Sequence, residues 1–357
     1  MVTILAIDGG GIRGLLPARM LQEIQFRLRA AGDRNPLALH FDLIAGTSTG
    51  ALIALRTALL DRDGAEPYSA ADIVDLYVRR GKEIFPPRLR TTHKAIQAFR
   101  YKYAGAGLEG LLADLFGDAS LNSAATNLLI TSFDTEAMEP HCMRGGPSRA
   151  TWANHLDYYM RDAARASAAA PTFFPPARVS PIGFPHIRLS LIDGAVFANN
   201  PSGLAYVEST KIFPSEDDIL ILSLGTGKER RGFCYDEIHS WGYVEWINPV
   251  RGFPLGAIVS AAQSETVNHQ LSRIRGVRYL RIDTPLRDCD SPIDDSSGRN
   301  LDCLNRLADE MLEENDGRID EVLKTLISKR VPLESVEPLA IFEPGGRSQV
   351  LTGVSPI

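Results

Sequence analysis

The stretch FDLIAGTSTG, residues 41–50, joins a short apolar strand to an apolar helical pattern that continues to Leu60. Its last five residues match G-x-S-x-G, a pattern that carries a serine on a tight turn between a strand and a helix. The two glycines relieve crowding at such a turn, and Ser48 would project from its tip. The amide of Thr49 would then point to where an oxyanion forms. We predict a strand–turn–helix unit with Ser48 as candidate nucleophile, the alternative being a small-residue turn with an N-capping serine.

Outward from this unit, apolar runs alternate with helical patterns along most of the chain, which is typical of a layered α/β fold. No internal repeat and no linker rich in Pro, Gly or Ser divides the chain, so we expect one catalytic unit with a C-terminal helical extension. Strands are expected at 3–7, 41–45, 128–133, 187–192, 219–224 and 277–282, and helices at 15–31, 50–60, 69–82, 108–116, 155–170, 254–274 and 301–327.

The composition excludes several classes of protein. Of the 357 residues, 44% are hydrophobic, which is enough for a large core and rules out a disordered chain. Thirty-eight basic and 44 acidic residues give a net charge of −6, which argues against a nucleic-acid partner. We find no transmembrane segment and no signal peptide and expect a cytoplasmic protein. Its cysteines are expected to be free thiols of a reducing compartment, since no CxxC spacing occurs among Cys142, Cys234, Cys289 and Cys303.

A glycine loop, DGGGIRG at residues 8–14, follows the first strand and precedes the first long helix. Glycines expose backbone amides, and a helix N-terminus adds positive potential, so such a loop can hold a phosphate or stabilise an oxyanion. The loop also fits the dinucleotide pattern G-x-G-x-x-G. That alternative requires an acidic residue roughly 20 residues on, at the end of the second strand. The second strand ends in Ile44-Ala45-Gly46 instead, which disfavours a nucleotide site.

Asp193, in the segment LIDGA at residues 191–195, is the candidate base for Ser48. An Asp-Gly pair after a strand is commonly only a turn. A Ser-His-Asp triad in the order of the α/β-hydrolases would need a later histidine, and only His239 and His269 follow Asp193. Those enzymes also place several strands before the serine, and residues 1–47 have room for two. A Ser48–Asp193 dyad is therefore favoured, and the triad remains an alternative.

Taken together, these motifs resemble those of the patatin-like phospholipases. DGGGIRG resembles the oxyanion loop of that family, GTSTG at residues 46–50 its nucleophile elbow, and DGA at residues 193–195 its aspartate motif. The likeness extends over about residues 2–285, and no usable motif follows Arg287. Further similar segments are IFP at 84–86, ASAAAPTFFPP at 166–176, DGAVFANNP at 193–201 and LSLGTG at 222–227.

The resemblance implies a three-layer α/β/α fold around a mostly parallel sheet, distinct from a typical α/β-hydrolase. Residues 1–285 would form the catalytic domain and residues 286–357 a helical extension packed on the same unit. The implied activity is that of a phospholipase A type lipid acyl hydrolase that needs neither a metal nor a cofactor. In the same family pattern, Ser48 is the nucleophile, Asp193 the base, Gly10 and Gly11 the source of oxyanion amides, and Arg13 the residue that orients the loop.

The expected partners are a phospholipid or other acyl ester and a membrane surface met from the cytoplasm. The basic and aromatic stretch 88–102 would contact anionic headgroups, a solvated helix face being the simpler interpretation. Trp241, Tyr243 and Trp246 form an aromatic cluster that suits a lipid pocket or core packing. A second hypothesis also remains open: a phospholipase effector of bacterial antiphage signalling with a cyclic nucleotide as activator.

Overall fold

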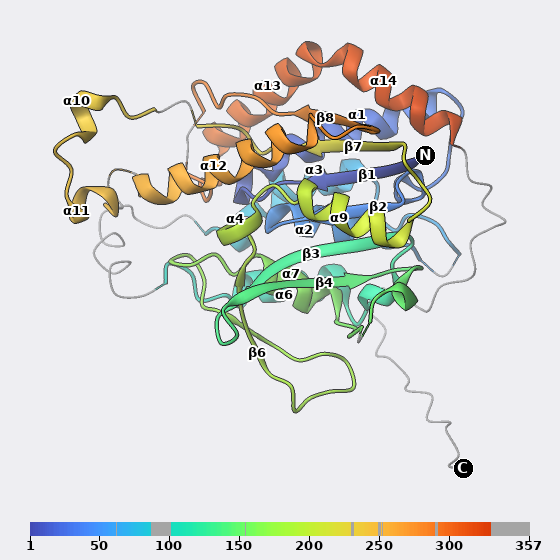
Figure 1. The fold of residues 1–357 in the computed structure, drawn as a ribbon, viewed down its shortest axis with the longest axis horizontal. Coiled ribbons are helices and arrows are strands. Elements are labelled where there is room, and N and C mark those ends of the chain that lie inside the picture. The colour runs from blue at the N-terminus through green and yellow to red at the C-terminus, as the bar shows by residue number, and fades with distance from the viewer. Residues whose placement is uncertain are drawn as a thin grey trace.

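The computed structural model of the protein describes residues 1–61, 63–86, 101–153, 155–229, 232–248, 251, 253–289 and 292–329. In these residues one eight-stranded sheet has the order β5-β6-β3-β2-β1-β7-β8, with β4 paired to β3 (Figure 1). The central pairs β3–β2, β2–β1, β1–β7 and β7–β8 are parallel, and the pairs that involve β4, β5 and β6 are antiparallel. The strands are β1 Val2–Ile7, β2 Leu43–Gly46, β3 Asn127–Asp134, β4 Glu139–Gly145, β5 Ala177–Val179, β6 Leu189–Asp193, β7 Ile219–Leu224 and β8 Val277–Ile282.

Helices cover both faces of this sheet. They are needed on both sides because successive side chains of a strand point to opposite faces, and here both sets are apolar. On β1, Leu5 and Ile7 face the larger core, whereas Val2 and Ile4 face the smaller one. The larger core is built with α1 Leu15–Ala30, α2 Thr49–Ala58, α3 Ala70–Asp75, α6 Ala106–Phe116, α7 Met160–Ser167, α13 Gly298–Glu314 and α14 Asp316–Ser328. The smaller core lies under α9 Ser202–Ile212 and α12 Pro254–Leu271. The short helices are α4 Gly81–Ile84, α8 Ala195–Ala198, α10 Tyr235–Ile238 and α11 Tyr243–Trp246. This arrangement is the expected three-layer α/β/α architecture.

Two strands meet end to end on one edge of β3. β4 pairs with β3 from Leu128 to Asp134 and occupies one edge. β2 and β6 therefore share the other edge, where Gly46 of β2 pairs with Ile130 and Asp193 of β6 pairs with Ser132. Because β6 runs antiparallel to β3, the C-terminal ends of β2 and β6 point at each other. The residues that follow these two strands are thus brought together from distant parts of the chain.

All six expected strands are present, but β4 and β5 were not foreseen. The expected helix over 155–170 begins only at Met160, because the carboxylate of Asp157 accepts the amides of Asn122 and Tyr158 and holds the preceding chain outside the helix. The helix expected over 301–327 is two helices, α13 and α14, separated at Asn315. The helix expected from residue 69 begins at Ala70, and its N-cap Ser69 forms a capping box with Asp72. No helix among the described residues is long and apolar enough to span a bilayer.

The expectation of four free thiols is wrong for two of them. Cys289 and Cys303 form a disulfide, and Cys142 and Cys234 are free. Thirteen residues separate the paired cysteines in sequence, and no spacing motif marks them. Folding brings them together because α13 turns back toward the loop that precedes it. Within the linked segment, the carbonyl of Ile293 accepts the amide of Ile12, so this segment contacts the glycine loop.

Candidate active site

Ser48 lies at the turn between β2 and α2 with φ 55° and ψ −118°, a backbone conformation that is strained for a residue with a side chain. Neighbouring glycines make this turn sterically possible. A Cβ on Gly46 would lie 2.3 Å from the carbonyl oxygen of Gly50, and one on Gly50 would lie 2.2 Å from that of Ile7. The expected strand–turn–helix placement is therefore confirmed, and the serine stands at the N-terminus of an almost wholly buried helix.

Asp193 ends β6 and lies beside Ser48. Its carboxylate accepts a hydrogen bond, 2.8 Å long, from the Ala195 amide, and it also interacts with the neighbouring Ser48 side chain. Burial raises the pKa of Asp193 to about 7, and the interactions with Ala195 and Ser48 oppose this rise. A carboxylate with a pKa near neutrality is a far better proton acceptor at physiological pH than an ordinary aspartate.

The C-terminal end of α7 holds the backbone of both residues. The Ser167 hydroxyl accepts the amide of Ser48 at 2.8 Å, and the carbonyl of Ala169 accepts the amide of Asp193 at 3.1 Å. Ser167 is fully buried, so this contact is sheltered from water. In the sequence, the segment 166–176 stands out only by its resemblance to the patatin-like phospholipases, and nothing there assigns a role to Ser167. The sole signal was the run of small residues, which allows the close approach of α7 to both strand ends.

The glycine loop lies next to Ser48 and contains unused donors. The amides of Gly9, Ile12 and Arg13 bind the carbonyls of Asn199, Ile293 and Gly10. Among the hydrogen bonds of the described residues, by contrast, none uses the amides of Gly10, Gly11 or Thr49. All three of these residues line the same cavity as Ser48. Free amides converging beside a hydroxyl can stabilise negative charge that develops on a bound carbonyl oxygen.

Tight packing fixes the position of the glycine loop. A Cβ on Gly10 would lie 2.2 Å from the Thr226 hydroxyl, which itself donates to the Gly9 carbonyl at 2.6 Å. Gly11 has φ 58° and would place a Cβ 2.1 Å from the carbonyl oxygen of Ile293. Neither Thr226 nor Ile293 was foreseen as a support of the loop. Thr226 lies in the noted segment LSLGTG, whereas no sequence signal marks Ile293.

Two arginines bind the loop. Arg13 donates from Nε to the Gly10 carbonyl at 3.4 Å, and its guanidinium is 3.9 Å from Glu229. Burial lowers the pKa of Arg13. At the start of the loop, the buried carboxylate of Asp8 accepts two hydrogen bonds from Arg281 of β8, at 2.8 and 2.6 Å. Arg281 also binds Asp283, so this charge cluster anchors the loop to the edge of the sheet.

A cavity of about 590 Å³ opens next to Ser48 and Asp193. Its walls are mostly apolar and are supplied by α2, α6, α7, the segment after α7 and the first turns of α12. Phe174 lines the cavity and packs on Phe85 and Tyr103, with ring centroids 6.2 and 5.6 Å apart. A long apolar group with one reactive polar centre suits such a space.

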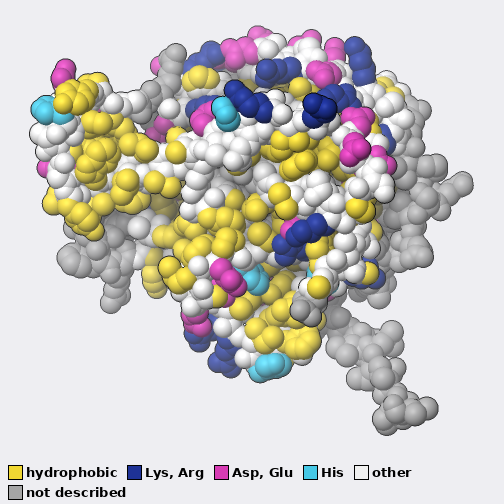
Figure 2. Space-filling model, viewed as in Figure 1, with side chains coloured by type: hydrophobic (Ala, Val, Ile, Leu, Met, Phe, Trp, Pro, Cys, Tyr) yellow, Lys and Arg dark blue, Asp and Glu magenta, His cyan; other side chains and the backbone are white. Residues whose placement is uncertain are grey.

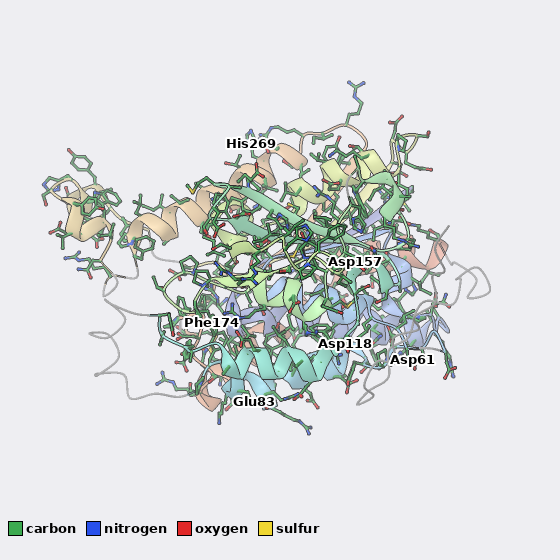
Figure 3. All side chains as sticks on the ribbon, turned by 90° about the horizontal axis from the view of Figure 1, so that it is seen from below. Asp61, Glu83, Asp118, Asp157, Phe174 and His269 are labelled. Carbon is green, nitrogen blue, oxygen red and sulfur yellow. A yellow bond between two sulfur atoms is a disulfide. The ribbon has the colours of Figure 1, made fainter. Side chains whose placement is uncertain are left out.

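No described histidine is placed to complete a triad. None lines the cavity within the described part of the chain, and His239 is exposed, with its ring against the carbonyls of Tyr235 and Asp236. Figure 3 shows His269, on α12, on the other side of the molecule from Phe174, which lines the cavity. Nor do the described residues contain a group of three or more His, Cys, Asp or Glu side chains suited to a metal ion.

Other residues singled out from the sequence lie away from this cavity or beyond the described residues. Arg88, Arg90, Lys94 and Arg100 of the basic stretch are outside the described residues, and Lys102 is described and forms an ion pair with Asp294. Among the expected aromatic cluster, the rings of Trp241 and Trp246 meet edge to face at 5.2 Å, while Tyr243 is 81% exposed. None of these three lines the cavity.

Comparison with known proteins agrees with the family resemblance and with the fold class. The family model for patatin-like phospholipase matches residues 5–206. The chain is 33% identical over 349 residues to "Patatin-like protein 2" of Arabidopsis thaliana, covering 90% of this chain and 85% of the relative. It is 30% identical over 371 residues to "Patatin-T5" of Solanum tuberosum, covering 94% and 92%. These similarities place the chain among the lipid acyl hydrolases in the broad sense. More narrowly, it belongs to the patatin-like phospholipase family.

Two further similar proteins are a relative named as inactive and a solved structure. The chain is 30% identical over 342 residues to "Probable inactive patatin-3-Kuras 1" of Solanum tuberosum, covering 88% of this chain and 87% of the relative. The solved structure of VipD from Legionella pneumophila matches with a TM-score of 0.37 and 13% identity, covering 88% of this chain and 67% of that one. Because a relative named as inactive is about as similar as the others, the site itself must carry the argument for activity.

Proposed function

We propose that the protein hydrolyses carboxylic esters of membrane phospholipids with a Ser48–Asp193 dyad, as a phospholipase A type enzyme. One observation carries the proposal: Ser48 lies in the same cavity as the buried carboxylate of Asp193 and interacts with it, and burial raises the pKa of that carboxylate to about 7. The unused amides of Gly10, Gly11 and Thr49 beside the same cavity support it.

The proposed reaction has two halves. The Ser48 oxygen attacks the ester carbonyl carbon while its proton passes to Asp193, and the free amides stabilise the resulting oxyanion. When this tetrahedral intermediate collapses, the carbon–oxygen bond to the lysolipid breaks and Asp193 returns the proton to the leaving alkoxide. Water then attacks the acyl-serine, giving its proton to Asp193, and the fatty acid leaves as Ser48 regains its proton. No charge or atom is left unbalanced in this cycle.

The acid–base behaviour of the dyad makes this cycle feasible near neutral pH. An aspartate with its ordinary pKa of 3.8 would accept the serine proton poorly, whereas burial raises the pKa of Asp193 to about 7. This carboxylate is therefore about 10³-fold more basic than an exposed one. Electrostatic stabilisation of the oxyanion by the loop amides would supply much of the remaining rate enhancement.

The apolar cavity favours a lipid ester over a small polar one. An acyl chain would lie along the walls formed by residues such as Leu52, Leu112 and Phe174, with its ester group at Ser48. We further propose that the enzyme works in the cytoplasm and reaches its substrate by peripheral contact with a membrane.

The decisive experiment is the Ser48→Ala variant. Hydrolysis of a chromogenic acyl ester and of phosphatidylcholine should be lost, while the circular dichroism spectrum stays that of the wild type. Ser272→Ala, which alters an exposed serine outside the cavity, is the matched control and should keep full activity. Turnover retained by a folded Ser48→Ala protein would overturn the assignment.

A further inference from the structure

Exposed apolar side chains are concentrated in one part of the chain. Of the fifteen large hydrophobic side chains exposed among the described residues, eight lie between residues 235 and 259. We call this group the apolar arm. It comprises Tyr235, Tyr243, Val244, Ile247, Phe253, Leu255, Ile258 and Val259.

The apolar arm projects from the body of the protein. Figure 1 shows α10, α11 and the N-terminal part of α12 extending beyond the sheet and its covering helices, at the left of the view. Figure 2, drawn from the same side, shows hydrophobic side chains gathered on this projection. Monomeric proteins rarely expose large contiguous apolar surfaces unless these surfaces bind something.

The arm is continuous with the mouth of the active-site cavity. Phe253, Leu255 and Val259 belong to the exposed arm and also line the cavity that contains Ser48. A molecule that leaves an apolar medium along the arm would therefore reach the candidate nucleophile without crossing water. A second copy of the chain seated on the arm would instead cover this entrance.

Charge on the arm does not suit an anionic surface. Between residues 232 and 259, the described side chains include the acidic Asp236, Glu237 and Glu245 and one basic residue, Arg251. Attraction to this part of the molecule must therefore come mainly from burial of apolar surface, which salt screens little.

We infer that the apolar arm docks the protein on a lipid surface and delivers acyl chains from that surface to the cavity. The inference rests on the proposed hydrolysis of lipid esters. It assigns to the apolar arm the membrane contact that the basic stretch 88–102 was expected to make. Docking through the arm is apolar, so it requires neither anionic lipid nor low salt.

The test compares Tyr243→Ser/Val244→Ser with the wild type on neutral phosphatidylcholine vesicles. Both side chains are exposed and neither lines the cavity, so the fold and the chemistry of the site are left intact. Affinity for vesicles, measured by flotation, should fall at least tenfold, since burial of one apolar side chain is worth about a factor of ten. Vesicle hydrolysis should fall with it, while hydrolysis of a soluble short-chain ester stays within about twofold.

A matched control and three contrary outcomes make the test decisive. Phe26→Ser/Met138→Ser removes two equally exposed side chains elsewhere and should leave vesicle binding unchanged. Equal vesicle binding by the arm variant and the wild type would overturn the inference, as would binding lost in high salt or absent without anionic lipid. Elution of the wild type as a dimer that the arm substitutions dissociate would assign the arm to a second copy and also overturn it. Failure of the wild type to cleave the soluble ester would count against the proposed function alone, because vesicle binding is measured separately.

Discussion

Replacing Asp193 by asparagine removes a negative charge from the candidate site and changes its shape very little. The amide oxygen can still accept the Ala195 amide that the carboxylate accepts at 2.8 Å. A neutral amide cannot take the proton of Ser48, so we expect kcat to fall by about 10²–10⁴-fold, the usual worth of a general base. The same substitution should make the folded protein more stable, because a buried charge is lost.

The size of this gain follows from the pKa of Asp193, which burial raises from 3.8 to about 7. Below about pH 4 the carboxyl is protonated in both the folded and the unfolded protein, and the substitution changes stability little. Between about pH 4 and about pH 7 the unfolded state releases this proton and the folded state keeps it, so the wild type loses stability as pH rises. Above about pH 7 the full difference is reached, at most about 4 kcal/mol in favour of the variant.

Urea unfolding of both proteins at about pH 5 and about pH 8, followed by circular dichroism, measures this difference. The free energy of unfolding of the variant, relative to the wild type, should rise with pH. Asp302→Asn, which neutralises an exposed carboxylate on α13, should show no such rise. A stability difference that is independent of pH, or that favours the wild type at about pH 8, would refute the claim that Asp193 is a buried base with a raised pKa.

Three further substitutions test the contacts that hold the site in place. Ser167→Ala leaves the amide of Ser48 without its acceptor, at a cost of about 1–3 kcal/mol, and should lower kcat about tenfold with little change in KM; an unchanged kcat would exclude a positioning role. Gly10→Ala sets a methyl group 2.2 Å from the Thr226 hydroxyl and should lower kcat on a soluble ester by about 10²–10³-fold, whereas a change in KM alone would contradict the oxyanion assignment. Cys289→Ser opens the disulfide and should lower the free energy of unfolding in urea by about 3 kcal/mol, so equal stability would show that the bond contributes nothing.

Local features of the fold were predictable because they depend on nearby residues. The segments that became β1, β2 and β7 are short and mainly apolar, and those that became β3, β6 and β8 keep several apolar residues among polar ones. β4 and β5 were missed because their sequences carry little apolar pattern: β4 has exposed residues at one end, and β5 has three residues. Such edge strands form because a neighbouring strand offers unpaired backbone groups, which is a property of the assembled sheet.

The same distinction applies to the candidate site. Ser48, Gly10 and Gly11 stand in motifs whose spacing reflects a turn or a close approach of backbones, and the structure brings them together as expected. Ser167 and Ile293 act through a single hydroxyl and a single backbone carbonyl, and their partners lie far away in the chain. No sequence pattern within a short window can record such a contact. The disulfide was missed for the same reason.

Because β2 and β6 meet on one edge of β3, the register in which these strands pair decides when activity can appear during folding. Strand pairing changes only in whole residues: a slip of β6 by one residue would turn Asp193 to the opposite face, and a slip by two would move it by about 7 Å. A nearly correct sheet therefore places no carboxylate beside Ser48. With the proposed Ser48–Asp193 dyad, catalysis begins only when both strands have docked in their native register, and the return of activity after dilution from denaturant should then mark the completion of this distant pairing.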